Sequence, residues 1–267
     1  ILSYYSSNNY YNRYMISLLM ITKNSGELLE KSLYSVKGLV DEMVIVDDNS
    51  SDNTLQIAKK FNARIFKRHD ENLGRQRAYG LSKCRGEWIL ILDADEQISS
   101  QLKEEIALST TKVGTRNDIL GYFIPYQNHF LGKPIYYGGE NYKILRLFKK
   151  SSATISDNLI HEHVKVEGKV GELKAKIYHY SYLTLRQTFM KFTDYAKREA
   201  KRKISSSEKT SLKKIFFYPI HMFWARYIKD RGYKDFSLRI LLDLGFAYME
   251  WLTYVLMLFY KNESKKS

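Results

Sequence analysis

Short apolar runs alternate with amphipathic stretches along the first half of the chain. The runs are continuous in apolar residues, which is typical of strands that are buried on both faces of a sheet. Between the first two runs, apolar residues recur at helical spacing at Leu28, Leu29, Leu33, Val36 and Leu39. The pattern predicts strands at 16–21, 43–46, 64–66 and 88–92, with helices at 28–39, from a cap at Asp52 to Phe61, and at 75–83.

Strands that alternate with helices in this way predict an α/β fold with a mostly parallel sheet covered on both faces. The pattern changes after Gly121, where β-type runs such as 143–148 are joined by glycine-rich turns. From Leu183 onward the spacing is helical, with a polar loop at 205–209. We therefore expect further mixed strands in the middle of the chain and helices at its end.

Ligands in open α/β sheets bind beyond the carboxyl ends of the strands, so the polar residues after each apolar run are the candidates for chemistry. Four such groups are present, and the predicted topology brings them to one edge of the sheet. They are Thr22-Lys23-Asn24, Asp47-Asp48-Asn49-Ser50, Asn72-Leu73-Gly74-Arg75-Gln76-Arg77 and Asp93-Ala94-Asp95-Glu96.

Asp93 and Asp95 are the strongest candidates, because they are separated by one residue and come directly after a buried run. Mg²⁺ or Mn²⁺ binds a few carboxylates, and diphosphate oxygens and water complete its shell. Such a cation would neutralise charge on a departing nucleoside diphosphate. The alternative is that these acids cap a helix and occupy its first turn.

The other strand ends fit a nucleotide. A carboxylate at Asp47 or Asp48 could accept a hydrogen bond from a ribose hydroxyl or a base N–H, and we favour Asp48; the alternative is ordinary turn chemistry. In the loop that begins at Asn72, Arg75 or Arg77 could pair with a diphosphate.

Taken together, these motifs resemble those of family-2 glycosyltransferases. The residues that carry the resemblance lie between Ile16 and Ile98 and read Ile-Thr-Lys-Asn, Val-Ile-Val-Asp-Asp-Asn-Ser-Ser-Asp-Asn-Thr, Asn-Leu-Gly-Arg-Gln-Arg-Ala and Trp-Ile-Leu-Ile-Leu-Asp-Ala-Asp-Glu. The Asp-Ala-Asp-Glu form and a later His-Glu pair are similar to the lipopolysaccharide-core glucosyltransferase branch.

The resemblance implies a GT-A fold, a UDP-sugar donor and inversion at the anomeric carbon. By position, Thr22 and Asn24 match the loop beside the nucleobase, and Asp48 matches the acid near the uridine. Asp93 and Asp95 match the motif that holds the metal and the diphosphate. Mn²⁺ or Mg²⁺ is the expected cofactor, and a glycan or glycolipid, such as lipopolysaccharide core, is the expected acceptor.

An inverting displacement also needs a base that accepts the proton of the acceptor hydroxyl. Relatives often carry Glu-Asp where this chain has His161-Glu162, so Glu162 is the first candidate. Glu140 and His161 are the alternatives. His161 or His179 could complete a metal shell, and a structural histidine is equally compatible with the sequence. Arg146 could bind the acceptor or the diphosphate, or be an ordinary strand charge.

Charge separates the end of the chain from the rest. The net charge is +14, and residues 186–267 contain 18 Lys/Arg and 8 Asp/Glu. In 189–203 the basic residues are interleaved with aromatic ones, which suits an anionic membrane surface. The segment 238–260 is nearly long enough to cross a bilayer, but it contains Asp243 and Glu250, so we expect it to lie on the membrane or pack on the enzyme.

The expected domains are a weakly ordered lead-in at 1–15, a nucleotide-sugar-binding half at 16–120, an acceptor-side half at 121–182 and a helical, basic and aromatic extension at 183–267. Cys84 is the single cysteine and no secretory pattern is evident, so we expect a cytoplasmic enzyme, peripheral on the inner face of the membrane.

Two other functions fit part of the sequence. A nucleic-acid-binding protein would explain the basic charge but not the acids at the strand ends, so we expect no nucleic-acid partner. A non-catalytic homologue would bind a nucleotide sugar without transferring it.

Overall fold

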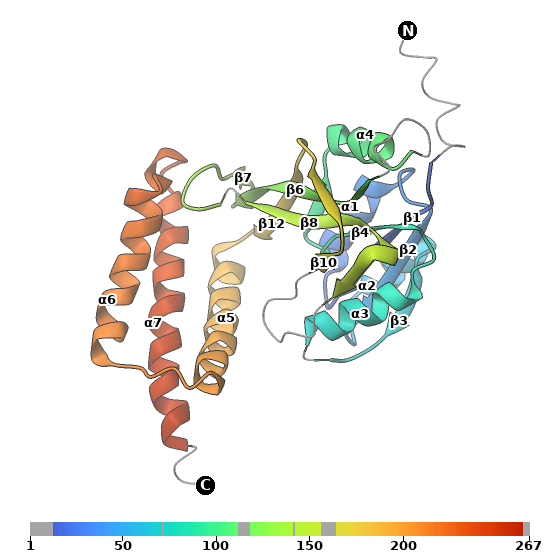
Figure 1. Cartoon of the computed structure of the whole chain (residues 1–267). Helices are drawn as coiled ribbons and strands as arrows, with labels where there is room; N and C mark the ends of the chain where they lie inside the picture. Colours follow the sequence, from blue (N-terminus) through green and yellow to red (C-terminus); the bar gives the residue numbers. More distant parts are fainter. Residues whose placement is uncertain (1–12, 71, 112–117, 141, 156–163, 264–267) are drawn as a thin grey trace. The chain divides into compact units, whose positions relative to one another are not determined.

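The structure is a computed structural model of the chain, and it describes residues 13–70, 72–111, 118–140, 142–155 and 164–263. The chain forms two compact units (Figure 1). Unit 1 comprises Ile1–Tyr126 and Lys143–His179, and unit 2 comprises Gln127–Tyr142 and Tyr180–Ser267. The predicted lead-in at 1–15 lies mainly outside the described residues.

Four strands of unit 1 form a parallel sheet with the order β3-β2-β1-β4. The central strand β1 is almost fully buried, as its continuous apolar sequence predicts. Leu18 of β1 pairs with Met43 of β2 on one side and with Leu90 of β4 on the other. The strands are β1 (Ile16–Thr22), β2 (Glu42–Asp47), β3 (Arg64–Lys67) and β4 (Trp88–Ile91).

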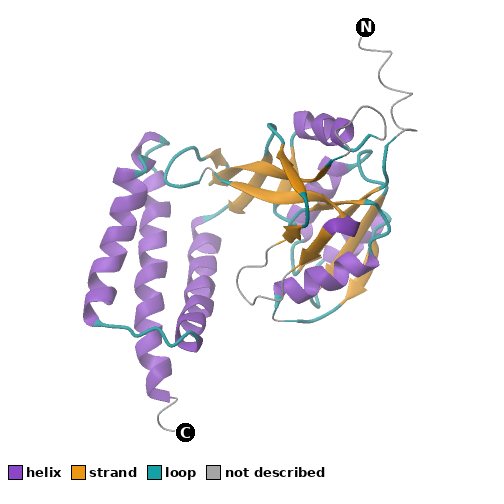
Figure 2. Cartoon of the chain, viewed as in Figure 1, coloured by secondary structure: helices purple, strands orange, loops and turns teal. Residues whose placement is uncertain are grey.

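Helices cover both faces of this sheet because alternate strand residues point to opposite faces. Leu18 and Met20 share one core with Leu29 and Leu33 of α1. On the other face, Leu19 packs in a second core beside α3. The helices of unit 1 are α1 (Gly26–Val36), α2 (Thr54–Lys60), α3 (Leu73–Lys83) and α4 (Ser100–Ser109) (Figure 2).

Gly80 explains how α3 can lie so close to the sheet. A Cβ atom at this position would lie 2.4 Å from the Leu19 side chain and 2.9 Å from that of Val46. A larger residue would therefore push the helix away from β1 and β2. The close packing keeps the amino end of α3 beside the carboxyl ends of the strands.

The remaining strands of unit 1 are mostly antiparallel. Strand β8 pairs with β4, and β6 pairs with β8, both antiparallel. Strand β12 pairs antiparallel with β5, with His179 opposite Glu96. These and the smaller strands are β5 (Glu96–Ile98), β6 (Ile119–Phe130), β7 (Lys133–Pro134), β8 (Lys143–Lys149), β9 (Ala153–Ile155), β10 (Val164–Val166), β11 (Lys169–Glu172) and β12 (Ile177–Tyr182). Of these, β7 and the last residues of β6 and β12 belong to unit 2.

Unit 2 is mainly helical, and its long helix α7 packs against α5 and α6. Small residues allow this packing: Ala196 and Ala200 of α5 are fully buried, and Gly245 of α7 lies against the ring of Phe192. The elements are α5 (Leu185–Ser205), α6 (Leu212–Phe223), the π-helix η3 (Trp224–Lys229), the 3₁₀ turn η4 (Gly232–Lys234) and α7 (Arg239–Glu263); a further 3₁₀ turn, η2 (Lys150–Ser152), belongs to unit 1.

Within the described residues, one helix is long and apolar enough to cross a membrane. It is the part of α7 from Arg239 to Tyr260, with a mean hydropathy of 1.4, of which a third is buried in the structure. A central helix of a soluble bundle can have the same length and composition. Helix α7 also packs against α5 and α6.

The predicted fold class is confirmed: an α/β sheet that is parallel from β1 to β4, with flanking helices and a helical C-terminal region. The four predicted strands are present, and their bounds differ from the prediction by one residue at each end at most. The predicted capping contact of Asp52 is present, although Asp52 is not the residue directly before the helix. Asn53 precedes the first residue of α2, and the Asp52 carboxylate accepts the N–H groups of Thr54 (3.0 Å) and Gly26 (3.1 Å), so it joins two helix starts.

Candidate active site

Asp93 lies just beyond β4 and is held by two guanidinium groups. Arg77 of α3 donates a hydrogen bond to Asp93 Oδ1, and Arg146 Nη2 of β8 lies 3.0 Å from Oδ2. Burial alone would raise the pKa of Asp93, but the two arginines outweigh it and hold this pKa well below its usual range. Asp93 is therefore ionised at neutral pH, and each of its oxygens has an arginine partner.

Glu96 is the acid behind this pair, and its side chain is almost completely buried. It accepts hydrogen bonds from the Tyr126 hydroxyl (2.7 Å), from Arg146 Nη2 (3.0 Å) and from the Asp93 N–H (3.0 Å). Burial raises the pKa of Glu96, although Arg146 opposes the rise. The hydrogen bonds of Glu96 hold the Arg146 side chain and the backbone of Asp93 in place. Glu96 is therefore a structural residue of the site.

Asp95 lies close to His179. The distance from His179 Nε2 to Asp95 Oδ2 is 3.5 Å, and each side chain is 19% exposed. Strand pairing produces this proximity, because β12 runs antiparallel to β5, which begins immediately after Asp95. The edge of the Tyr126 ring faces His179, with 5.8 Å between the ring centroids. An acid and an imidazole therefore meet at an accessible point beside Asp93.

The alternative for Asp93 and Asp95, a helix cap with an acidic first turn, is excluded by the secondary structure of the next residues. Residues Glu96–Ile98 form β5, and the next helix, α4, begins at Ser100 with its own cap at Ser99. The Asp-Ala-Asp turn thus connects two strands and has no helix to stabilise.

The described residues contain no group of three or more His, Cys, Asp or Glu side chains that could by itself hold a metal ion. Asp95 and His179 remain as a pair of groups of the kinds that bind divalent cations. Such a pair fits a cation that takes its other ligands from diphosphate and water.

The ends of β1 and β2 form the second part of the site. Asp47 is fully buried and accepts hydrogen bonds from Thr22 Oγ1 (3.3 Å) and from the Ser50 N–H (2.9 Å). It shapes the turn, as the alternative interpretation of this motif predicts. Thr22 is itself 2% exposed, so its hydroxyl acts within this turn.

Asp48, unlike Asp47, lies beside two basic side chains, those of Lys23 and His69. Its oxygens lie 2.9 Å from Lys23 Nζ and 2.5 Å from His69 Nδ1. Burial raises the pKa of Asp48, but hydrogen bonds from Lys23 and His69 outweigh it and lower this pKa below its usual value. Asp48 is therefore a charged acceptor at the strand ends, and Lys23 and His69 are neighbours that sequence reasoning did not single out.

Asn24 has a left-handed backbone, with φ of 48°, which asparagine tolerates better than most residues. Its side-chain oxygen accepts the Ser51 N–H at 2.8 Å, and its own N–H donates to Ser50 Oγ at 2.9 Å. These bonds join the loop after β1 to the loop after β2. The two loops that match the nucleobase side in the resemblance are thus held together.

The Asn72 loop has mainly structural contacts. Asn72 caps α3 by accepting the Arg75 N–H at 3.1 Å, and Arg75 itself pairs with Asp70 at 3.1 Å. The Arg75 side chain is 52% exposed, whereas that of Arg77 is 10% exposed and turned to Asp93. Of the two candidate arginines, the structure brings only Arg77 to the Asp93 group.

The three candidates for the base, Glu140, His161 and Glu162, are not among the side chains around Asp93 that the structure describes. Glu140 is in unit 2, where it pairs with Arg226 and accepts a hydrogen bond from Asn128 Nδ2 at 2.8 Å. His161 and Glu162 lie outside the described residues. The sequence did not reveal the roles of Glu96 and Tyr126. The position of Glu96 directly after Asp95 was a signal that could have identified it, whereas a tyrosine on a strand gives no such signal.

Comparison with known proteins agrees with this arrangement. The family described as glycosyl transferase family 2 matches residues 17–133. An uncharacterised glycosyltransferase of Rickettsia prowazekii is 30% identical over 207 residues, which cover 73% of this chain and 70% of that protein. The lipopolysaccharide core biosynthesis glycosyltransferase LpsC of Rhizobium meliloti is 23% identical over 225 residues, which cover 80% of this chain and 81% of that protein.

Among solved structures, the S. aureus TarS fragment in complex with UDP-GlcNAc has a TM-score of 0.47 and 16% identity, and the match covers 93% of this chain and 92% of that one. The family match includes the strand ends that hold Asp48, Asp93 and Asp95. The relative from Rickettsia extends the likeness to about three quarters of the chain. This chain is a glycosyltransferase and belongs to glycosyltransferase family 2.

Proposed function

We propose that this glycosyltransferase uses a UDP-sugar and a divalent cation, and that it inverts the anomeric carbon during transfer. The observation that carries the proposal is the meeting of Asp95 and His179, 3.5 Å apart, beside an Asp93 that two arginines hold in place. This acid–imidazole pair lies at the end of β4, where ligands of α/β sheets bind.

Asp95 and His179 would hold Mn²⁺ or Mg²⁺, with diphosphate and water as the other ligands. When bound, the cation supplies neutralising charge to the departing diphosphate. Both oxygens of Asp93 already contact arginines. We therefore propose that Asp93 positions Arg77 and Arg146 and is not itself a metal ligand.

Asp48 and the loop from Thr22 to Asn24 would bind the uridine. Asp48 is an ionised acceptor, and the two loops beside it are tied together through Asn24. An ionised carboxylate accepts strong hydrogen bonds from base N–H or ribose hydroxyl groups. The strand ends thus offer a charged acceptor in a fixed position, as recognition of a nucleoside requires.

Glu162 is our choice for the base that takes the acceptor proton. Glu140 is less suited because it is 6% exposed and paired with Arg226. Glu96 is 1% exposed, and its oxygens already accept hydrogen bonds from Tyr126, Arg146 and the backbone. If Glu162 is the base, Glu162→Gln lowers kcat by roughly 10²- to 10⁴-fold and leaves UDP affinity unchanged. Normal turnover in this variant would move the role to His161 or Glu140.

The acceptor class is suggested by the likeness to LpsC, whose name places that protein in lipopolysaccharide core biosynthesis. We propose a hydroxyl of lipopolysaccharide core or a similar surface glycan, reached from the cytoplasmic face of the membrane. A non-catalytic nucleotide-sugar-binding protein would retain the donor site but hydrolyse or transfer no sugar. A nucleic-acid-binding protein would bind heparin-like polyanions without any preference for UDP.

Isothermal titration calorimetry with UDP, ADP and GDP tests the donor class, and hydrolysis of a panel of UDP-sugars tests the chemistry. We expect a clear preference for UDP, and hydrolysis that EDTA abolishes and Mn²⁺ or Mg²⁺ restores. Equal affinity for the three nucleotides would refute the uridine site. Full activity after removal of metal would refute the assignment of Asp95 and His179.

A further inference from the structure

Helix α6 carries large apolar side chains that stay exposed among the described residues of the chain. Leu212, Phe216, Phe217 and Ile220 are 71%, 62%, 62% and 67% exposed. Their spacing places them on neighbouring turns of one helix, so they form a continuous surface, which we call the α6 apolar face. Trp224 and Ile228 continue it along η3 at 49% and 47% exposure.

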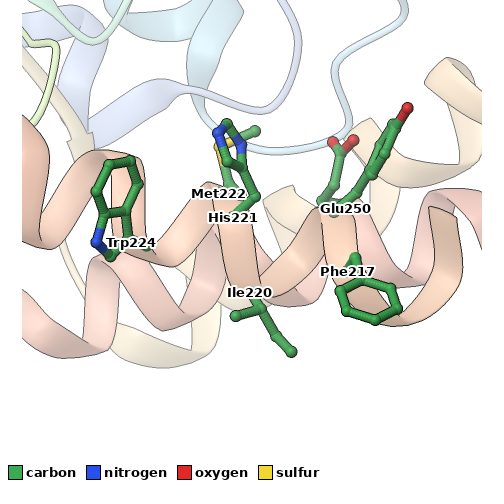
Figure 3. A pocket seen from close by; sticks show the side chains of 7 residues that line it. Phe217, Ile220, His221, Met222, Trp224 and Glu250 are labelled. Atoms are coloured by element: carbon green, nitrogen blue, oxygen red, sulfur yellow. The ribbon is translucent and has the colours of Figure 1, made fainter. Parts of the chain in front are cut away.

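The α6 apolar face lies opposite the packing contacts of the helix. Ile215 is the buried residue of α6, and it joins a core with Ala200, Tyr254 and Met257. Beside the face is a hollow of about 720 Å³ whose lining includes Phe217, Ile220 and Glu250. Figure 3 shows Phe217 and Ile220 projecting to the same side of the helix, away from Glu250. The face is thus available for a partner while the helix stays packed on α7.

Basic residues flank the face at both ends. Exposed Lys209 and Lys213 lie at the start of α6, and exposed Lys229, Arg231 and Lys234 lie at the end of η3 and just beyond it. Among them, Asp230 is the exposed acid. An apolar helix face with cations at its ends is the pattern of a helix that lies in the interface of an anionic bilayer.

We propose that α6 is the membrane-docking element of this protein, with its apolar face inserted among lipid acyl chains and its flanking cations on anionic headgroups. From Leu212 to Ile228 the helix is about 24 Å long at 1.5 Å per residue, so it can lie along the surface. The inference concerns attachment and does not depend on which donor or acceptor the enzyme uses.

A second copy of the chain is the competing occupant. Self-association through this face would bring together the basic ends of two chains, each with a net charge of +14. Like charges at an interface oppose association, whereas anionic lipid attracts them. Charge complementarity therefore favours the lipid surface.

The first experiment is co-sedimentation of the full chain with vesicles of phosphatidylglycerol and phosphatidylcholine, or of phosphatidylcholine alone. We expect binding to the anionic vesicles that weakens as salt rises, because screening reduces surface attraction. Phe216→Glu with Ile220→Glu should weaken binding by more than about tenfold, since two apolar side chains that would insert among the acyl chains are lost. This double variant should bind UDP as the unmodified chain does.

The matched control is Tyr34→Glu with Leu108→Glu. These residues are 70% and 60% exposed on α1 and α4, so the control adds the same charge at apolar positions of similar exposure. We expect vesicle binding to be unchanged. Equal loss in the two double variants would show that only net charge matters and would overturn the role of the α6 apolar face.

A labelled cysteine gives a readout that does not depend on loss of binding. Cys84 is the single cysteine and is 2% exposed, so a thiol-reactive NBD dye should label Ile220→Cys selectively. NBD emission should rise and shift to the blue with anionic vesicles, and should not change when the dye is placed at Leu108→Cys. An unchanged spectrum at residue 220 would overturn insertion.

Light scattering after size exclusion separates lipid from a second copy. We expect a species of the same mass for the unmodified chain and for Phe216→Glu with Ile220→Glu. A dimer that becomes a monomer in the double variant, without lipid binding, would assign the face to self-association and overturn the proposal.

Discussion

Charged side chains gather in both units, but under opposite conditions. In unit 1, Asp95 and its neighbour His179 are each 19% exposed, and Asp95 lies just beyond the carboxyl end of the parallel strand β4. In unit 2, Arg239 and Asp243 are completely buried and pair at 2.9 Å. An accessible charged side chain can form contacts with a ligand. A buried charged side chain must keep its protein partners, because losing them would leave a charge without compensation.

The buried group of unit 2 has a clear structural task. Arg226 pairs with Asp243 at 3.2 Å and also with Glu140, and Asp235 accepts the Tyr136 N–H at 2.8 Å. The group therefore joins the loop around residues 136–140 to η3 and the start of α7. The comparison teaches that a conspicuous acid such as Glu140 can be structural when it is buried and paired with arginine.

Asp95→Asn should give the largest effect on activity. The amide keeps the size of the side chain but loses the charge that would face His179 and a cation, so kcat/KM should fall by more than about 100-fold. The thermal midpoint should stay close to that of the unmodified protein, because Asp95 is accessible. Donor hydrolysis and a thermal melt on the same preparation check both statements. A variant that unfolds would place Asp95 with the structural charges.

Asp243→Ala should lower stability and leave donor binding unchanged, the reverse of what is expected for Asp95→Asn. It leaves Arg239 buried without its closest partner, which costs about 3–5 kcal/mol of unfolding free energy. Denaturant unfolding measures the loss, and UDP affinity per folded molecule should not change. The control is Arg239→Met with Asp243→Leu, which removes this pair together and should restore part of the stability. The recovery is partial because Asp235, 3.6 Å from Arg239, and Arg226, 3.2 Å from Asp243, each lose a partner. If Asp243→Ala is as stable as the unmodified protein, water or a movement of neighbouring side chains must compensate the buried charge of Arg239.

Asp48→Asn tests a smaller effect within unit 1. Loss of the charge that Lys23 and His69 face should weaken UDP binding by roughly tenfold, since a hydrogen bond to a charged group is lost. The preference for UDP over ADP should narrow at the same time. Asp47→Asn is the contrasting change, because Asp47 is buried in the turn and its replacement should lower stability as well as affinity. Unaltered UDP affinity in Asp48→Asn would remove Asp48 from the site.

Cys84 should give the smallest change and serves as a reporter of unit 1. Burial raises the pKa of its thiol to about 12. The thiolate, which is the reactive form, is therefore about 10⁻⁴ of the total at pH 8 and increases only as the pH approaches this pKa. Iodoacetamide should label native protein very slowly and unfolded protein quickly. Rapid labelling of native Asp95→Asn would indicate that this variant disturbs unit 1.

The strands and their ends could be predicted because their information is local. The continuous apolar runs determine β1 to β4, and parallel topology then brings Asp48, Asp93 and Asp95 to one edge. The helix after Asp52 was also predicted from local information: Asn53 precedes its first residue without a side-chain capping bond, and Asp52 makes the contact to the Thr54 N–H.

The partners of the site residues could not be predicted in the same way. Arg146 reaches Asp93 across 53 residues of sequence, and Tyr126 reaches Glu96 across 30. From the sequence, His161 was the first candidate for a histidine ligand of the metal and His179 the reserve. The antiparallel pairing of β12 with β5 brought His179 to Asp95.

The sequence by itself determined the alternation of strands and helices, the motifs at the strand ends and the concentration of basic charge near the C-terminus. These are properties of composition and of spacing within about twenty residues, where periodicity reports which side chains share a face. The tertiary structure decided which acids are accessible, which arginines hold Asp93 and which face of α6 remains uncovered. Burial and pairing depend on segments far apart in the chain, so no local pattern contains them.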